Sequence, residues 1–339
     1  MTSAAPVAVF ERAAVNAQTF IGEVLPGRHP VVLRAQMAHW PSVAASAGGD
    51  RAIAEYLSHF AGGKPLDVMI GLPSAKGQFF YADDTLETFN FTRQKVPLDA
   101  FVRELLRLSE QNIDEPHALY ANSAEAKDHL PGWEADNPMD LPVDNAPARL
   151  WIGNQTVVAT HYDTSFNVAC VVAGRRRFTL FPPDQLANLY VGPLDRTLAG
   201  PPTSLVDPEA PDLARYPRFA DAQKTMMVAE LGPGDAIVIP PLWWHHVRAT
   251  GRFNVLANYW WDHQSGAAFL ALIHAVMSVR DLPVAEKAAF ENWYHHLVFS
   301  DEAAKAADHL PESARSVLGP ASPARTERLR SFLIAMLSR

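Results

Sequence analysis

Short apolar runs separated by Pro, Gly and Asp fill the middle of the chain, between residues 149 and 262. Each run is four to nine residues long, the length of a strand rather than of a helix. They cover residues 150–153, 167–172, 177–181, 236–239 and 253–261. Many short strands with this punctuation are typical of a β-sandwich or barrel.

The N-terminal part, up to about residue 148, has mixed periodicity. Ile53, Tyr56, Leu57 and Phe60 recur at helical spacing and predict a helix over residues 52–60. Phe101, Leu105 and Leu108 predict a second helix over residues 98–108. Residues 31–34 follow a turn signal and read as a strand, whereas residues 131–147 are rich in Pro, Asp and Asn and read as a loop.

The C-terminal part, from residue 266, has helical periodicity. Ser322 and Pro323 are typical of an N-cap and a first helical position. An apolar stripe follows at Leu329, Phe332, Leu333, Met336 and Leu337. Such a stripe forms part of a core or, alternatively, a face for self-association. We therefore expect two domains, residues 1–262 and residues 263–339. A homodimer through the second domain is expected if the stripe is a self-association face.

Composition narrows the class of protein. The 339 residues are 48% hydrophobic and 19% charged, as in ordinary globular proteins. The net charge is −8 and no Lys/Arg block occurs, which predicts no nucleic-acid partner. Cys170 is the only cysteine, so no intrachain disulfide forms. No signal peptide and no run of about 18 apolar residues is found, so we expect a cytoplasmic protein with no membrane partner.

One long segment interrupts the β-rich region. Residues 182–224 are rich in Pro and show no regular periodicity. A loop of this length inside a compact domain is usually functional or disordered. We expect it to cover the functional site.

His161 and Asp163 carry the strongest chemical signal. Residues two apart on a strand point to the same side, so both side chains would project into a barrel together. A third ligand from another strand would complete the His–Asp–His facial triad that holds non-haem Fe(II). The candidates are His245 and His246 in Trp243-Trp244-His245-His246, of which only one can face the same side. His-x-Asp alone is a common pattern and would not establish a metal site.

Several motifs together resemble the JmjC-type, cupin-like 2-oxoglutarate oxygenases, and among them most closely the asparaginyl hydroxylase that acts on hypoxia-inducible factor. The likeness extends over roughly residues 25–262. The matching segments are His161-Tyr162-Asp163, residues 174–185, Gly232-Pro233-Gly234-Asp235, residues 240–246 and Asn258-Tyr259-Trp260.

The resemblance implies a mainly β protein with helices (α+β), built on a double-stranded β-helix or jelly roll, with Fe(II) and 2-oxoglutarate as cofactors. It selects His245 as the third metal ligand. It also implies that Arg176, where the family has lysine, and Tyr120 bind the distal carboxylate of the cosubstrate. Asn167 and Asn258 match pocket asparagines, and Asn122, Asp195 and Arg196 match positions that contact the target.

One departure bears on activity. The family commonly has threonine three residues before the first ligand, where this chain has Val158, which cannot donate a hydrogen bond. The resemblance implies hydroxylation of a side chain of a protein or peptide, with release of succinate and CO₂; a small-molecule substrate is also compatible. The alternatives are a non-catalytic metal-binding cupin module, a cupin isomerase or dioxygenase without 2-oxoglutarate, and a lysine demethylase.

Overall fold

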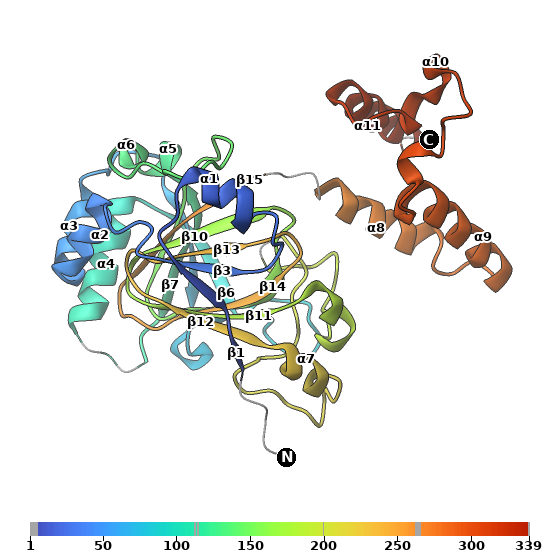
Figure 1. The fold of residues 1–339 in the computed structure, drawn as a ribbon. Coiled ribbons are helices and arrows are strands. Elements are labelled where there is room, and N and C mark those ends of the chain that lie inside the picture. The colour runs from blue at the N-terminus through green and yellow to red at the C-terminus, as the bar shows by residue number, and fades with distance from the viewer. Residues whose placement is uncertain (1–5, 112, 114, 199, 262–265, 338–339) are drawn as a thin grey trace. The chain divides into compact units, whose positions relative to one another are not determined.

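The computed structural model describes residues 6–111, 113, 115–198, 200–261 and 266–337. The chain divides into two compact units, Met1–Gly266 and Ala267–Arg339, and each is described by itself (Figure 1). Within the described residues, no helix is both long and apolar enough to cross a membrane.

Two β-sheets form the first unit. The six-stranded sheet has the order β1 (Val7–Ala8), β12 (Met227–Leu231), β11 (Arg176–Phe181), β14 (Trp244–Ala249), β9 (Val157–Tyr162), β5 (Gln78–Phe79). The nine-stranded sheet has the order β2 (Phe10–Ala13), β3 (Val31–Arg34), β13 (Ala236–Ile239), β10 (Phe166–Ala173), β15 (Asn254–Trp261), β8 (Arg149–Gly153), β7 (Ala118–Glu125), β4 (Leu66–Gly71), β6 (Phe91–Val96). From β8 to β15 the chain passes repeatedly between the two sheets, as in a double-stranded β-helix, which confirms the predicted fold class.

The centre of the nine-stranded sheet, at β10 and β13, is buried on both faces, whereas the edge strands β2 and β6 are largely exposed. One face meets the six-stranded sheet through an apolar cluster that includes Val171, Phe178 and Ile237. The other face packs against a larger cluster with contributions from α2 (Pro41–Ala47), α3 (Asp50–Ser58) and α4 (Leu98–Glu110), helices that Figure 1 shows grouped on one side. Every residue of β10 is buried, because this strand lies between the two clusters. Polar side chains on the inner faces are therefore enclosed by the two sheets.

Most of the predicted elements are present. The five predicted strands of the central region end within one residue of β8, β10, β11, β13 and β15, and α4 begins at the predicted residue. The N-terminal prediction was incomplete, since β4, β6 and β7 extend the nine-stranded sheet and were not expected. The expected loop over residues 131–147 contains a short helix, α6 (Trp133–Asp136). The remaining short elements of this unit are α1 (Ala17–Thr19), η1 (Phe20–Val24), η2 (Pro73–Ala75) and α5 (Ala126–His129).

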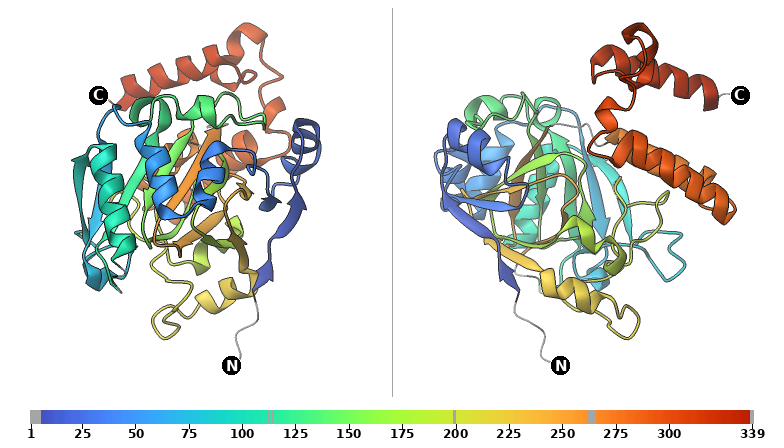
Figure 2. Two further views of the ribbon diagram at one scale, coloured as in Figure 1. Left: turned by 90° about the vertical axis from the view of Figure 1, so that its left-hand side faces the viewer. Right: turned by 45° about the vertical axis from the view of Figure 1, so that its right-hand side comes forward.

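Residues 182–224 are here called the covering segment. Their described part has little regular secondary structure, but it is packed against the rest of the first unit. They contain η3 (Pro183–Asn188) and most of α7 (Phe219–Thr225), seen at the lower end of the first unit in Figure 2. A small core fixes them to the six-stranded sheet and includes Leu189, Val206, Phe219 and Trp244. Glu209 adds ion pairs to Arg177 on β11 and Arg248 on β14.

The second unit is helical, as predicted. Its elements are α8 (Gly266–Ser278), α9 (Val284–Tyr294), η5 (His295–Phe299), η6 (Ala303–Lys305), α10 (Glu312–Arg315), η7 (Ser316–Leu318) and α11 (Pro323–Leu337). Ser322 caps α11, because its Oγ accepts a hydrogen bond from the Arg325 N–H at 3.1 Å. Of the predicted stripe, Phe332, Leu333 and Met336 are exposed, and the side chain of Leu337 lies outside the described residues.

Candidate metal centre

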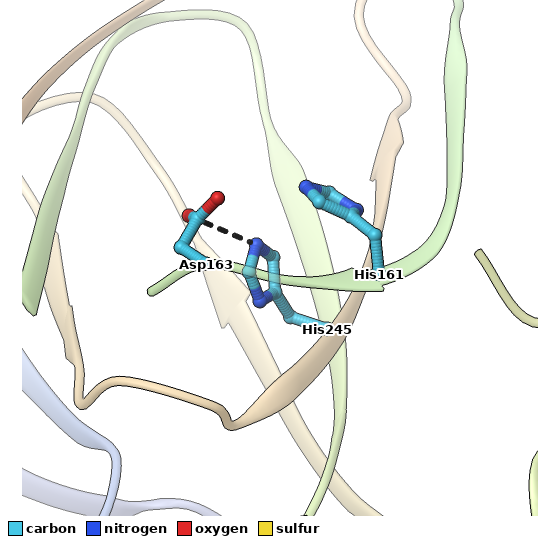
Figure 3. Close-up of side chains that lie close together, drawn as sticks. All are labelled: His161, Asp163 and His245. Carbon is cyan, nitrogen blue, oxygen red and sulfur yellow. Dashed lines mark ion pairs between the residues drawn. The ribbon is translucent and has the colours of Figure 1, made fainter. Parts of the chain in front are cut away.

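Two neighbouring strands bring His161 and His245 together. The residues are register partners on β9 and β14, and their ring centroids are 4.3 Å apart. Asp163 lies one residue beyond the end of β9, and its Oδ2 is 3.6 Å from His245 Nε2 (Figure 3). One ligand atom from each of the three residues lies within 4.8 Å of the other two. Three donors at this separation can bind a single ion.

Hydrogen bonds define the tautomer of both histidines. His161 Nδ1 lies 2.9 Å from the carbonyl oxygen of Ala159, and His245 Nδ1 lies 3.0 Å from that of Trp243. A carbonyl only accepts, so each Nδ1 carries the proton and each Nε2 keeps its lone pair. This is the form in which imidazole binds a metal, with the second nitrogen held by a backbone oxygen.

Burial keeps His245 neutral. The side chain is 3% exposed, and burial, reinforced by an electrostatic effect of the neighbouring His161, lowers the pKa of His245 to about 4. Two imidazoles and one carboxylate match the facial triad of non-haem Fe(II), so the residues present fit this metal. The arrangement leaves further coordination positions for other ligands.

A row of polar side chains holds the Asp163 carboxylate. Its Oδ2 accepts hydrogen bonds from Trp260 Nε1 at 3.0 Å and from Asn167 Nδ2 at 3.2 Å. Asn167 Oδ1 in turn accepts from Asn258 Nδ2 at 3.1 Å, and Asn258 Oδ1 accepts from Trp151 Nε1 at 2.7 Å. Asn167 and Asn258 were expected as pocket residues. Asn167 contacts the candidate metal ligand Asp163 directly, Asn258 is linked to it through Asn167, and both side chains are buried.

His246 lies outside this group. It pairs with Thr179 of β11 and is 1% exposed, and no partner for either ring nitrogen is found among the described residues. The metal-competent cluster contains His245 and not its neighbour. Strand parity left the choice between the two histidines open. The cluster contains His245, which is the one that the resemblance implied.

Arg176 is a fully buried cation with no anionic hydrogen-bond partner among the described residues. The side chain is 1% exposed, and within the described part of the chain its Nε and Nη2 have no hydrogen-bond partner. Burial lowers the pKa of Arg176. Tyr120 lies close enough to interact with it electrostatically, and burial raises the pKa of Tyr120 to about 12. A buried guanidinium is costly unless a carboxylate or phosphate pairs with it, so this position can accept an anionic ligand.

Val158 lines the same region. It packs against a buried cluster formed by Met69, Phe79, Ala118 and Tyr120. The side chain therefore adds an apolar contact where a threonine would add a hydroxyl donor near Tyr120.

The covering segment reaches the metal cluster. Thr203 forms an antiparallel bridge with His161, and the Ser204 N–H donates to the carbonyl oxygen of Thr160 at 2.8 Å. Of the expected target contacts, Asn122 is half-buried on β7, and Asp195 and Arg196 are exposed on the covering segment. The carbonyl oxygen of Arg196 accepts a 2.6 Å hydrogen bond from the Tyr81 hydroxyl, which ties this segment to the N-terminal region.

Two tryptophans in the site had no predicted role. Trp151 lies in a predicted strand and Trp260 in one of the resembling motifs, yet each acts here through its indole N–H. Aromatic residues in such runs usually pack in a core, so only the tertiary structure identifies these hydrogen bonds.

Comparison with known proteins agrees with this fold. The sequence matches the cupin-like domain family over residues 16–267. The chain belongs to this family. The match covers every strand from β3 to β15 and every residue of the candidate site.

The relatives carry several different names. The tRNA wybutosine-synthesizing protein 5 of Gallus gallus is 27% identical over 274 residues, which cover 74% of this chain and 75% of the relative. Lysine-specific demethylase 8 of Xenopus tropicalis is 25% identical over 247 residues, covering 72% and 50%. Lysine-specific demethylase JMJ31 of Arabidopsis thaliana is 37% identical over 158 residues, covering 47% and 25%. They support the JmjC, cupin-like family, and not the particular likeness to the asparaginyl hydroxylase.

Proposed function

We propose that the protein is an Fe(II)- and 2-oxoglutarate-dependent oxygenase that hydroxylates a side chain of a protein or peptide. The observation that carries the proposal is the convergence of His161, Asp163 and His245 within 4.8 Å. When bound, Fe(II) and 2-oxoglutarate supply the oxygen-activating chemistry. In the overall reaction, O₂, 2-oxoglutarate and a C–H bond give succinate, CO₂ and a C–OH group.

The chain's own residues would bind and orient the reactants. His161, Asp163 and His245 would hold the metal, and the Trp260 and Asn167 N–H groups would fix the carboxylate of Asp163. Arg176 would pair with the distal carboxylate of 2-oxoglutarate through its two unpartnered nitrogens, and Tyr120 would donate its phenolic proton to the same group. A bound dicarboxylate would thereby neutralise the charge that is otherwise buried alone.

The enclosing layers would exclude bulk water. The central strands of the nine-stranded sheet are buried on both faces, and residues 203–204 close one side next to His161. A dry interior strengthens the charge pairing between Arg176 and the cosubstrate.

The relatives differ in the class of substrate that their names indicate. The demethylases of Xenopus tropicalis and Arabidopsis thaliana carry lysine in their names, and the relative in Gallus gallus carries tRNA. The expectation that nucleic acid is excluded, drawn from overall charge alone, is at odds with the last of these. A protein or peptide substrate is our proposal, and RNA is a separate outcome of the test below.

A homodimer through the second unit is also proposed. Large apolar side chains are exposed on its helices, among them Leu270, Met277, Trp293 and Phe299. Such residues are usually covered by a partner, and a second copy presents the same surface. Gel filtration with light scattering tests this, and a strictly monomeric mass would contradict it.

The first experiment measures the conversion of 2-oxoglutarate to succinate without an added substrate. Purified protein with Fe(II) and 2-oxoglutarate is expected to release succinate in air, and His161→Ala and Asp163→Ala are expected to abolish this release. Mass spectrometry of lysate proteins, and of nucleosides from digested RNA, then seeks one added oxygen. Metal binding with no succinate from any mixture would instead support the non-catalytic cupin module, which Val158 favours.

A further inference from the structure

Trp151 stands at the start of the hydrogen-bond row that ends on Asp163. It lies on β8, Asn258 on β15 and Asn167 on β10, and these strands are neighbours in the nine-stranded sheet. The three hydrogen bonds along the row measure 2.7, 3.1 and 3.2 Å. The row therefore crosses three adjacent strands on their inner face.

The groups at the two ends of the row require the same direction of hydrogen-bond donation, from Trp151 towards Asp163. An indole N–H only donates and a carboxylate only accepts, whereas an asparagine amide can turn either way. With Trp151 at one end, Asn258 must present its oxygen to the indole and its NH₂ group to Asn167. Asn167 must then present its NH₂ group to Asp163. Each amide is thus locked in the orientation that supports the carboxylate.

We propose that Trp151 is a positioning residue for the metal, acting through Asn258 and Asn167 on Asp163. The inference rests on the proposed function, because it takes Asp163 as a metal ligand. Groups that orient a ligand typically change metal affinity about 10- to 100-fold when removed. Without the indole N–H, the buried oxygen of Asn258 loses its donor, and the row loses one of the two constraints on its direction.

Packing alone is the competing explanation for Trp151. Its ring lies 5.7 Å from that of Trp260, edge to face, and 5.9 Å from that of Tyr120. A substitution could therefore displace Trp260, the other donor to Asp163. The two explanations differ, because a packing role would not depend on Asn258.

Binding of Co(II) separates the two explanations, since its visible absorption reports the ligand set without turnover. Trp151→Phe keeps a ring and removes the N–H, and we expect it to weaken Co(II) binding about 10-fold. Phe79→Leu is the matched control, because Phe79 stacks on Tyr120 at 5.9 Å in the cluster against which Trp151 packs but forms none of the hydrogen bonds of the row. It is expected to lower the melting temperature and leave the Co(II) affinity and spectrum unchanged.

A double-mutant cycle completes the test. If Trp151 acts through Asn258, adding Trp151→Phe to Asn258→Leu causes no further loss of Co(II) affinity. Equal losses in both backgrounds, or parent-like binding by Trp151→Phe, would overturn the positioning role while leaving the proposed function intact. Failure of the parent protein to bind Co(II) would instead overturn the proposed function.

Discussion

His161 and His245 face each other as register partners on β9 and β14, with both Nδ1 atoms held by backbone carbonyls and both Nε2 atoms free to bind. The strand pairing that builds the barrel thus also builds two thirds of the candidate metal site. Asp163 completes it from the turn that follows β9.

The identity of the third ligand gives the first prediction. His245→Ala is expected to abolish Fe(II) or Co(II) binding, because it removes one of three donors. His246→Ala removes a buried ring outside the cluster and is expected to lower stability by about 2 kcal/mol, as cavity-forming substitutions do. Metal titration with a parallel melting curve measures both effects, and metal loss in His246→Ala with retention in His245→Ala would reverse the assignment.

Arg176 is expected to lower the stability of the ligand-free protein and to strengthen the binding of 2-oxoglutarate. Arg176→Met removes a buried unpaired charge and keeps much of the side-chain volume, so the melting temperature without 2-oxoglutarate should equal or exceed that of the parent. Binding of 2-oxoglutarate should weaken at least about 100-fold, because the charge-assisted hydrogen bonds are lost. Calorimetry and thermal unfolding test this, and unchanged cosubstrate affinity would exclude Arg176 from the site.

A substitution at Val158 is expected to strengthen the binding of 2-oxoglutarate. Val158→Thr adds a hydroxyl beside Tyr120, where a single neutral hydrogen bond contributes about 0.5–1.5 kcal/mol. Affinity for 2-oxoglutarate is expected to rise about 2- to 10-fold, with Val158→Ala as the control that removes volume without adding a donor. Weaker binding in Val158→Thr than in the parent would show that the pocket does not use a donor at this position.

Cys170 should be inert in the folded protein. It is fully buried on β10, and burial raises the pKa of the Cys170 thiol. A raised pKa suppresses the reactive thiolate, so raising the pH to 9 should not start reaction with a disulfide reagent such as DTNB. Reaction is expected only in denaturant, and rapid labelling of native protein at pH 9 would contradict the burial of β10.

The extent to which sequence predicted this structure depends on how local each signal was. The five central strands are continuous apolar runs, because strands buried on both faces leave no polar alternation. β6 was missed since it is an edge strand with four exposed central residues, Thr92 to Lys95, and few apolar positions. The covering segment read as an irregular loop because Leu189, Val206 and Phe219, which form its core, are too far apart to show a period.

The candidate site was predictable only where its residues are close together in the sequence. His161 and Asp163 are two residues apart, so strand geometry predicts that they lie together, although Asp163 itself lies one residue beyond the end of β9. His245, Tyr120 and Arg176 came from resemblance, because their approach depends on which strands pair. Trp151 had no signal of its own, since a tryptophan that donates to a buried amide has the same sequence context as one that only packs.

We expect one metal ion and one dicarboxylate to bind together in this barrel. An anaerobic titration with Fe(II) and 2-oxoglutarate tests it most directly, because the bidentate keto acid bound to Fe(II) gives a visible charge-transfer absorption band. We predict that the band develops with one equivalent of each, is absent in Asp163→Ala, and requires much more 2-oxoglutarate in Arg176→Met. A parent protein that gives no band under saturating Fe(II) and 2-oxoglutarate, or an Asp163→Ala variant that gives the same band, would contradict the account.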